Sequence, residues 1–197
     1  MRITFVIALL CLLAARAALG QIPKGNVFVG YSYARSDVLP ASNPTIMPSA
    51  VRANLNGWDG SLEGKVFPFV GIVVDISGQY GGQDFRFACE AIPSPPCTGQ
   101  AHVNSTLHNY LFGPRISVSV GKFTPFAHAL FGASHISTTG SGFSNSDTSF
   151  SEALGGGIDY KLIPAVAWRF QGELLQTRFF STTQNNLRLS TGIVIRF

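Results

Sequence analysis

The last eleven residues of the chain, Leu187–Phe197, read LRLSTGIVIRF and alternate between two kinds of side chain. The odd positions hold Leu, Leu, Thr, Ile, Ile and Phe, whereas the even positions hold Arg, Ser, Gly, Val and Arg. Because successive side chains of a β-strand point to opposite faces, this stretch predicts a strand with one apolar face and one charged face. A strand of this length that ends on an aromatic residue is typical of the last strand of a barrel in a lipid bilayer.

Seven earlier segments repeat this period or come close to it. They are residues 27–33, 57–66, 70–80, 108–120, 123–137, 150–160 and 166–177. In the 70–80 segment, for example, aliphatic residues and Tyr80 share one face, whereas Asp75, Ser77 and Gln79 share the other. The 123–137 segment carries a histidine and several apolar residues on both faces, so the pattern does not decide which of its faces points outward.

The connections between these segments alternate in length. Residues 67–69, 121–122 and 161–165 are short, whereas residues 34–56, 81–107, 138–149 and 178–186 are longer and rich in Ser, Asn, Gly, Thr and Pro. Short turns on one rim and long loops on the other are the layout of outer-membrane barrels. With both chain ends on the short-turn side, eight strands need three short turns and four long loops. The sequence therefore predicts an all-β, eight-stranded, antiparallel, up-and-down transmembrane β-barrel.

The alternative all-β fold is a soluble sandwich or a lipocalin-like barrel, in which the apolar faces point inward. Strands of about ten residues or more exceed the five or six residues that are usual in soluble proteins. The apolar faces also end in aromatic residues at both rims, as the interfacial girdles of a membrane barrel do. These two features favour the bilayer.

The N-terminus has the pattern of a secretory signal peptide. Met1-Arg2 precedes an apolar run over residues 3–13 and a zone of small residues over 14–20. We expect cleavage after Gly20, which leaves one barrel domain over residues 21–197 in the cell outer membrane. Cleavage removes Arg2 and Arg16, so that 12 Lys and Arg stand against 10 Asp and Glu, a formal charge of +2. With no basic run in the sequence, we expect no nucleic-acid partner.

The polar faces of the segments carry equal numbers of acidic and basic residues. An eight-stranded barrel has an interior only just wide enough for side chains, and charges buried there must be paired. We therefore predict a lumen closed by charge pairs. Its members are Asp59, Glu63, Lys65, Asp75, Arg115, Asp159, Arg169, Glu173, Arg188 and Arg196.

Two cysteines, Cys89 and Cys97, flank a Pro-rich stretch within the 81–107 connection. In an exported protein, an even number of cysteines at short spacing favours a disulfide bond, and we predict one here. A metal site is the alternative, but His102 is the only histidine nearby. The histidines His102, His108 and His128 have no spacing typical of a metal site, and we expect neither metal nor cofactor.

Three stretches carry a resemblance to a known family: VFVGYS at Val27–Ser32, GGGIDYK at Gly155–Lys161, and the final strand that ends on Phe197. On these the chain resembles the OmpA/OmpX-type family of small eight-stranded outer-membrane barrels over residues 26–197. The resemblance implies a structural or surface-interaction protein, without enzymatic activity, whose outer loops contact other molecules. It implies that the strand ending on Phe197 is the signal read by the barrel-assembly machinery, and that outer-membrane lipid and lipopolysaccharide surround the barrel. The unknown extracellular ligand is expected at the 81–107 connection.

Two other functions stay open at this point. Some eight-stranded barrels are lipid A modifying enzymes, and His135, Ser137 and Glu152 are residue types that an acyl hydrolase needs. They fall near the outer ends of two neighbouring strands. The second alternative is a narrow pore, which would require a lumen that is not closed.

Overall fold

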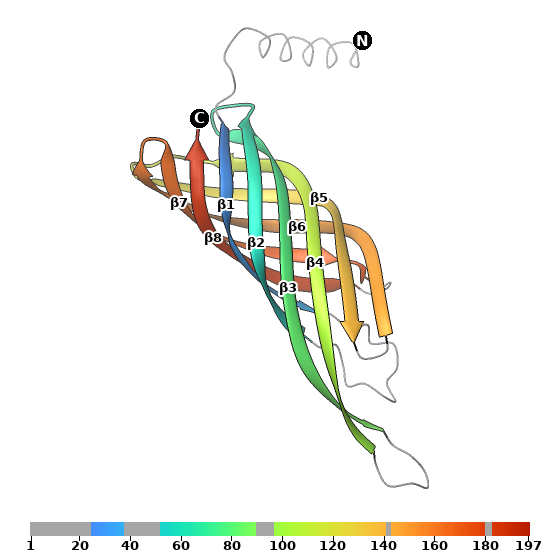
Figure 1. Cartoon of the computed structure of the whole chain (residues 1–197). Coiled ribbons are helices and arrows are strands. Elements are labelled where there is room, and N and C mark those ends of the chain that lie inside the picture. Colours follow the sequence, from blue (N-terminus) through green and yellow to red (C-terminus); the bar gives the residue numbers. More distant parts are fainter. Residues whose placement is uncertain (1–24, 38–51, 90–96, 141–142, 180–182) are drawn as a thin grey trace, which may run out of the picture.

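A computed structural model of the chain describes residues 25–37, 52–89, 97–140, 143–179 and 183–197. These residues form eight antiparallel strands, each paired with the next along the chain, and β1 pairs with β8 to close the barrel (Figure 1). The strands are β1 (Gly25–Asp37), β2 (Arg52–Lys65), β3 (Val70–Cys89), β4 (Cys97–Ser117), β5 (Phe123–Gly140), β6 (Phe143–Ile163), β7 (Val166–Thr177) and β8 (Gln184–Arg196). The predicted all-β, eight-stranded up-and-down barrel is confirmed. The proposed signal peptide, residues 1–20, lies outside the described residues.

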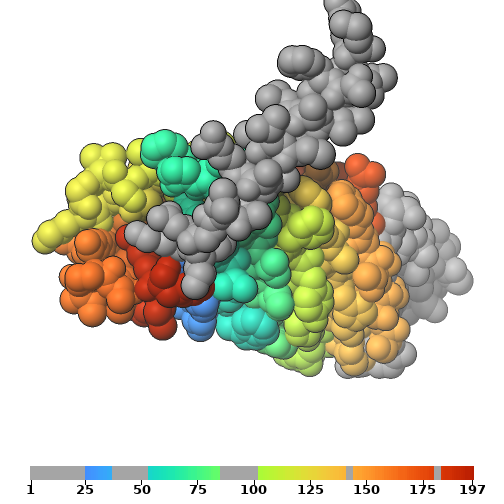
Figure 2. Space-filling view, turned by 90° about the horizontal axis from the view of Figure 1, so that it is seen from above, coloured from blue at the N-terminus to red at the C-terminus, as the bar shows by residue number. Residues whose placement is uncertain are grey.

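Closure of the barrel depends on a close contact between β1 and β8. Gly30 lies opposite Gly192, and a Cβ atom at Gly192 would lie 2.3 Å from the Cα of Gly30. Both positions are therefore restricted to glycine, because any side chain would force the two backbones apart. At the rim, the amide of Gly25 donates to the carbonyl of Phe197 at 3.0 Å, and the amide of Phe197 donates back at 3.1 Å. In the space-filling view, β8 (red) lies directly beside β1 (blue) (Figure 2).

The turns on the side of the chain termini are as short as the sequence predicts. Between β4 and β5, Val120 and Phe123 exchange two backbone hydrogen bonds of 2.8 and 3.0 Å around Gly121. Gly121 has a φ of 62°, which a residue with a side chain rarely adopts. The fourth strand ends at Ser117, three residues before the predicted end, because residues 118–122 form this turn.

The connections on the other side are shorter than predicted, because every strand except β7 continues there past its predicted segment. The largest difference concerns residues 81–107, predicted as one long loop, of which β3 takes the part up to Cys89 and β4 the part from Cys97. These two strands project well beyond the others (Figure 1). Similarly, β1 extends to Asp37 and β2 begins at Arg52, so the predicted 34–56 loop was also too long. Of the predicted 138–149 loop, β5 and β6 leave only residues 141–142, and β8 takes the last three residues of the predicted 178–186 loop.

The outer surface of the barrel is apolar between two belts of exposed aromatic residues. The belt toward the long connections contains Tyr31, Trp58, Tyr80, Tyr110 and Phe150, and the belt toward the termini contains Phe67, Phe69, Phe123, Tyr160, Trp168 and Phe197. On β3, Tyr80 lies ten positions after Val70. At about 3.3 Å per residue and a tilt of about 40°, they span roughly 25 Å, which is the height of the apolar band of a membrane barrel. Among the described residues, no helix is long and apolar enough to cross a membrane.

The fifth strand, whose facing the sequence leaves open, turns its even-numbered residues inward. Phe126, His128 and Leu130 are buried, whereas Phe123 and Phe131 are exposed on the outer face. The outer face of β5 carries several alanines, whose short side chains make it little more apolar than the inner face. The alternation inside and outside is therefore continuous around all eight strands.

Val74 lies on the outer face of β3 near the middle of the apolar band and is 47% exposed. We expect Val74→Arg to lower the free energy of unfolding by about 2–4 kcal/mol, because the charge must enter hydrocarbon. Urea titrations of the barrel refolded in phospholipid vesicles measure this value. Thr139→Arg is the matched control on the outer face of β5, beyond the aromatic belt, where we expect a cost of about 0–1 kcal/mol. Equal costs at the two positions would contradict the assignment of the membrane-facing band.

Candidate functional site

The lumen is the most highly organised polar region of the described structure. Period-two alternation turns the charged residues of every strand toward the barrel axis, because their outward neighbours are apolar. Eight of the predicted charged residues are at most 2% exposed: Asp59, Glu63, Asp75, Arg115, Asp159, Arg169, Glu173 and Arg188. Lys65 and Arg196 lie at the periplasmic rim and are 22% and 27% exposed.

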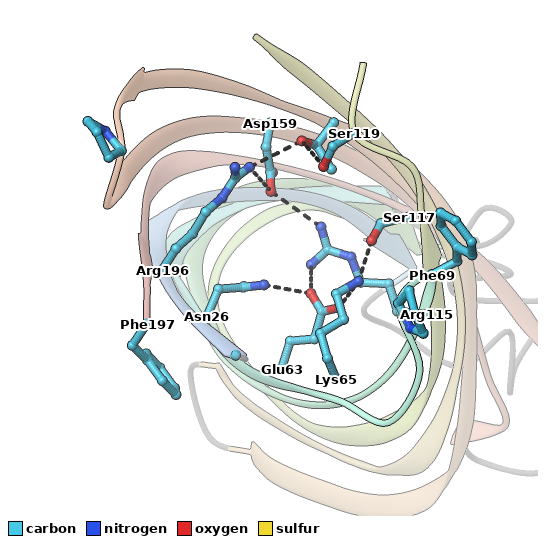
Figure 3. Close-up of a pocket in the computed structure, with 14 residues that line it drawn as sticks. Asn26, Glu63, Lys65, Phe69, Arg115, Ser117, Ser119, Asp159, Arg196 and Phe197 are labelled. Atoms are coloured by element: carbon cyan, nitrogen blue, oxygen red, sulfur yellow. Dashed lines mark hydrogen bonds and ion pairs between the residues drawn. The ribbon is translucent and has the colours of Figure 1, made fainter. Parts of the chain in front are cut away.

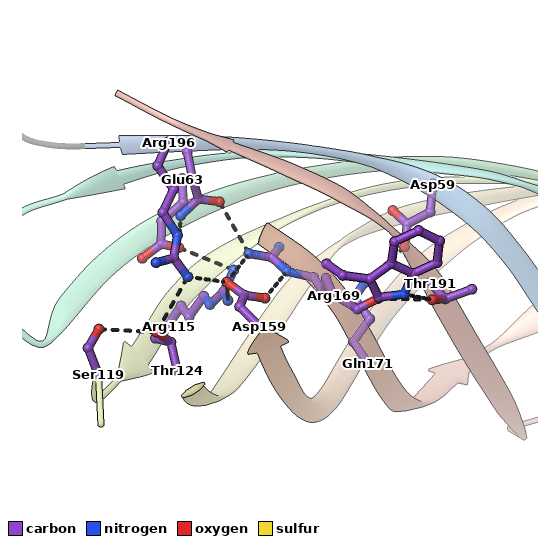
Figure 4. A network of polar contacts seen from close by, with 12 residues as sticks. Asp59, Glu63, Arg115, Ser119, Thr124, Asp159, Arg169, Gln171, Thr191 and Arg196 are labelled. Carbon is purple, nitrogen blue, oxygen red and sulfur yellow. Dashed lines mark hydrogen bonds and ion pairs between the residues drawn. The ribbon is translucent and has the colours of Figure 1, made fainter. Parts of the chain in front are cut away.

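Six of these charges form one network at the end of the barrel where the termini lie, which we call the vestibule cluster: Glu63, Lys65, Arg115, Asp159, Arg169 and Arg196 (Figures 3 and 4). Glu63 binds the Nζ of Lys65 at 2.9 Å and the Nη1 of Arg115 at 3.1 Å. Asp159 receives two hydrogen bonds from Arg169, at 2.7 and 3.1 Å. It also lies 3.5–3.6 Å from Arg115 and Arg196.

Aromatic rings fill the space between the arginines of the vestibule cluster. The guanidinium carbon of Arg115 lies 3.5 Å from the centre of the Phe126 ring, and that of Arg169 lies 4.9 Å from the same ring. Arg169 also lies 5.0 Å from the Phe28 ring. These cation–π contacts stabilise cations in a region that holds fewer carboxylates than guanidinium groups.

A second network, the central cluster, lies deeper in the lumen and consists of Asp75, His128, Glu173 and Arg188. Arg188 donates from Nε and Nη2 to Glu173 at 2.8 and 2.5 Å, and from Nη2 to Asp75 at 2.8 Å. The Nε2 of His128 lies 3.1 Å from the other carboxylate oxygen of Glu173. Arg188 is the one arginine in contact with both acids, so the cluster depends on it.

Asp59 contacts neither cluster through an ion pair among the described residues. Its Oδ2 atom accepts a hydrogen bond of 2.9 Å from Gln171, whereas its Oδ1 atom is buried without a hydrogen-bond partner. Beyond it, neutral side chains continue the polar contacts: Asn109 donates to Ser77 and Gln79, and Ser134 donates to Asn109.

Toward the long connections, the lumen holds buried aliphatic side chains among neutral polar ones such as Asn109, Ser134 and Asn186, and the charged residues of the predicted network do not extend to this part. A buried cluster, which we call the apolar plug, contains Ala34, Ala53, Leu55, Val73, Leu107, Leu111, Leu130, Ile136, Ala153, Leu175 and Phe179. Phe179 follows β7 in a segment predicted to be an outer loop, and it is completely buried. Alternating short and long aliphatic side chains can fill a narrow barrel as well as ion pairs can, without any desolvation of charge.

The residues of the proposed acyl hydrolase lie on the outer face but do not form a catalytic arrangement. The Nδ1 atom of His135 forms a hydrogen bond of 2.7 Å with the hydroxyl group of Thr148, the residue opposite it on β6. Glu152 on β6 lies opposite Phe131, which is four residues before His135 on β5. Ser137 lies opposite Ser146. The acid is therefore not positioned to orient this histidine, as a Ser–His–acid set requires.

The projecting part of β3 and β4 carries an exposed acid–base pair. The Nδ1 of His102 lies 2.7 Å from Asp84 and its Nε2 lies 3.2 Å from Asn104. The hydrogen bond with Asp84, followed by that with Asn104, raises the pKa of His102 above 6.5. The protonated form of His102 is therefore stabilised by this contact, and that contribution is present below pH 6.5 and is lost as the pH rises through the raised pKa.

The backbone register places Cys89 opposite Cys97 at the far end of the same hairpin. The disulfide between them stays a prediction. Phe197, the predicted assembly signal, lies on the outer face and is 64% exposed, and its backbone pairs with Gly25. In the part of the chain that the structure describes, no group of three or more His, Cys, Asp or Glu side chains could hold a metal ion.

Sequence reasoning missed three features of the lumen: His128, the ring of Phe126, and the apolar plug. His128 and Phe126 both lie on β5, where the outward face could not be told from the inward face. Part of the apolar plug could have been found, because Leu107, Leu111 and Leu175 fall on the same faces as the charges of their own strands.

Comparison with known proteins supports the fold. No family model matches the chain, and a search of curated proteins finds no match. The structure is similar to Ail, the attachment invasion locus protein of Yersinia pestis, with a TM-score of 0.59 and 14% identity over 90% of this chain and 100% of Ail. One structure of Ail is a complex with the heparin analogue sucrose octasulfate.

Neisserial surface protein A is similar at a TM-score of 0.55 and 14% identity, over 88% of this chain and 97% of that protein. The outer membrane protease OmpT from Escherichia coli has a TM-score of 0.54 and 7% identity, over 92% of this chain and 100% of OmpT. At these identities the similarity concerns the fold. The fold and the apolar outer band define a small eight-stranded outer-membrane β-barrel.

We expect Arg188→Met to lower the free energy of unfolding by about 3–5 kcal/mol, because Asp75 and Glu173 would stay buried without their shared cation. Urea unfolding of the barrel refolded in vesicles measures this loss. Arg196→Met is the matched control: Arg196 is 27% exposed and makes only contacts of 3.4 and 3.5 Å, so we expect about 1 kcal/mol or less. A loss for Arg188→Met no larger than for the control would contradict the central role of Arg188.

Proposed function

We propose that this protein is a non-conducting outer-membrane barrel with a structural or surface-interaction role, exerted through the segments beyond the membrane. One observation carries this proposal: the β3–β4 hairpin continues past the aromatic belt to Cys89 and Cys97. Cys89 lies nine positions after Tyr80, which is about 30 Å along an extended strand. Such a projection has no role in the bilayer, whereas it offers a surface to molecules outside the cell.

Two barriers of different chemistry support the proposed closure of the lumen. The vestibule and central clusters hold buried charges in mutual contact at the periplasmic side and in the middle. The apolar plug, together with buried neutral polar side chains, fills the side toward the outer loops. An ion that passed through would have to break buried ion pairs and then cross an apolar layer, and both steps are costly.

We expect planar bilayers that contain the protein to show no steady single-channel current. The same result is expected for Glu63→Gln, because the apolar plug remains when the vestibule cluster is weakened. Stepwise currents for the unaltered protein, increased by Glu63→Gln, would contradict a closed lumen and support the narrow pore instead. A refolded sample that migrates differently before and after boiling provides the control for barrel formation.

The aromatic belts and the apolar band between them support outer-membrane lipid and lipopolysaccharide as the surroundings of the barrel. We further propose that the final strand, with Phe197 exposed at its end, is recognised by the barrel-assembly machinery during insertion. The exported state implied by residues 1–20 is part of the same proposal. The predicted Cys89–Cys97 disulfide would tie the tip of the hairpin outside the membrane.

The hairpin is the proposed contact site for the extracellular ligand. Because a fold similar to this one binds a heparin analogue in Ail, sucrose octasulfate is the first probe. We expect calorimetry to show binding by the unaltered protein and its loss when residues 83–102 are replaced by a short turn. The matched control shortens the neighbouring β5–β6 hairpin by removing residues 138–145 and is expected to keep binding.

Two results would contradict this assignment. Equal binding by the protein with the shortened β3–β4 hairpin would exclude that hairpin as the contact site. No binding by the unaltered protein would exclude sulfated polyanions as its ligand class.

A further inference from the structure

The charges of the lumen are balanced in number but separated along the barrel axis. The vestibule cluster contains four cations, Lys65, Arg115, Arg169 and Arg196, in contact with only two carboxylates. Deeper in the lumen, the three carboxylates Asp59, Asp75 and Glu173 accompany one guanidinium, that of Arg188. The periplasmic end of the lumen therefore carries an excess of positive charge.

This positive end is also hollow. A cavity of about 520 Å³ opens there, between the turns that join β2 to β3 and β6 to β7 (Figure 3). Its lining includes three cations, two carboxylates and three hydroxyl groups: Lys65, Arg115, Arg196, Glu63, Asp159, Ser117, Ser119 and Thr124. A water molecule occupies about 30 Å³ in the liquid, so the cavity has room for a small anion together with several waters.

One buried donor in the lining has no partner among the described residues. The side chain of Arg115 is 2% exposed, and its Nε atom makes no hydrogen bond. Its Nη2 atom lies 3.6 Å from Asp159, which is longer than a charge-assisted hydrogen bond. Arg196, at the mouth of the cavity, reaches Thr124 and Asp159 only at 3.4 and 3.5 Å. Since an unsatisfied buried donor is costly, these two arginines have hydrogen-bonding capacity left for an acceptor in the cavity.

We propose that this periplasmic vestibule is a binding site for a small oxyanion, of the phosphate or carboxylate class. Lys65, Arg115 and Arg196 supply the charge, and Ser119 and Thr124 supply hydroxyl donors. Lys122 and Lys161 are exposed at the same rim, whereas the turns at residues 66–69, 118–122 and 164–165 contain no acidic residue. A rim of one sign of charge in front of a concave site raises the local concentration of anions.

The test is isothermal titration calorimetry with inorganic phosphate at constant ionic strength, on the barrel refolded in zwitterionic micelles. We expect saturable binding at one site and at least a tenfold loss of affinity for Arg196→Gln and for Lys65→Gln. Arg35→Gln is the matched control, because Arg35 is exposed on β1 far from the vestibule, and it should bind as the unaltered protein does. Substitution of Arg115 risks the fold, so its Nε–Hε resonance is followed by NMR instead and should shift as phosphate saturates.

Two further arms identify the ligand. Sodium acetate in place of phosphate reports on the carboxylate class, and tighter binding of either anion supports the site and names its preference. Phosphatidylglycerol added to the micelles competes with phosphate if a lipid headgroup can enter, and leaves phosphate binding unchanged if only a free anion can. The proposal is overturned if neither phosphate nor acetate shows saturable binding, or if Arg35→Gln weakens binding as much as Arg196→Gln does.

Discussion

The pairing of β1 with β8 is the contact on which the rest of this structure depends. Hydrocarbon offers no hydrogen-bond partner, so each unpaired backbone group on an open sheet edge would cost several kcal/mol. The ladder between these two strands runs from Asn26 opposite Arg196 to Arg35 opposite Leu187. The close approach of Gly30 and Gly192 permits this ladder to continue without interruption. Once this ladder has formed, every strand pairs with two neighbours, and the side chains of the membrane-spanning part point either to lipid or into the lumen.

The lumen that closure creates is narrow, and the chain fills it with two chemistries in separate zones. Toward the periplasm, arginines and carboxylates fill it, and the rings of Phe28 and Phe126 stack on the guanidinium groups. Toward the outside, aliphatic side chains, Phe179 and neutral polar side chains fill it. A buried ion pair is weak evidence for stability, because desolvation offsets much of its attraction. Its value here lies in register, since the contacts of Arg188 with Asp75 and Glu173 require one alignment of β3, β7 and β8.

The sequence contained enough information for the strand count, the order of the strands and the facing of seven of them. A charged residue cannot face lipid at low cost, so the faces that carry Asp59, Glu173 or Arg188 had to point inward. The same argument fails on β5, where histidine and small or aromatic residues occupy both faces. It fails again beyond the bilayer, because the outward face of β3 and β4 there carries Asp84, His102 and Asn104 and is no longer apolar. The alternating pattern also does not predict which charges form contacts. Asp75 and Arg188 are 113 positions apart, and their contact depends on the shear of the barrel.

Balance in the total charge of a barrel interior does not imply balance at each depth. Equal numbers of acids and bases predicted pairing, and pairs do form, yet the bases exceed the acids at the periplasmic end and the acids exceed the bases in the middle. Toward the outer loops, the interior continues with the apolar plug and with buried neutral polar side chains such as Asn109 and Ser134. The β3–β4 hairpin, which extends to Cys89 and Cys97, lies at the end of the barrel opposite the vestibule. The two ends of this barrel therefore differ in chemistry, with an excess of positive charge in the vestibule and with aliphatic and neutral polar side chains toward the hairpin.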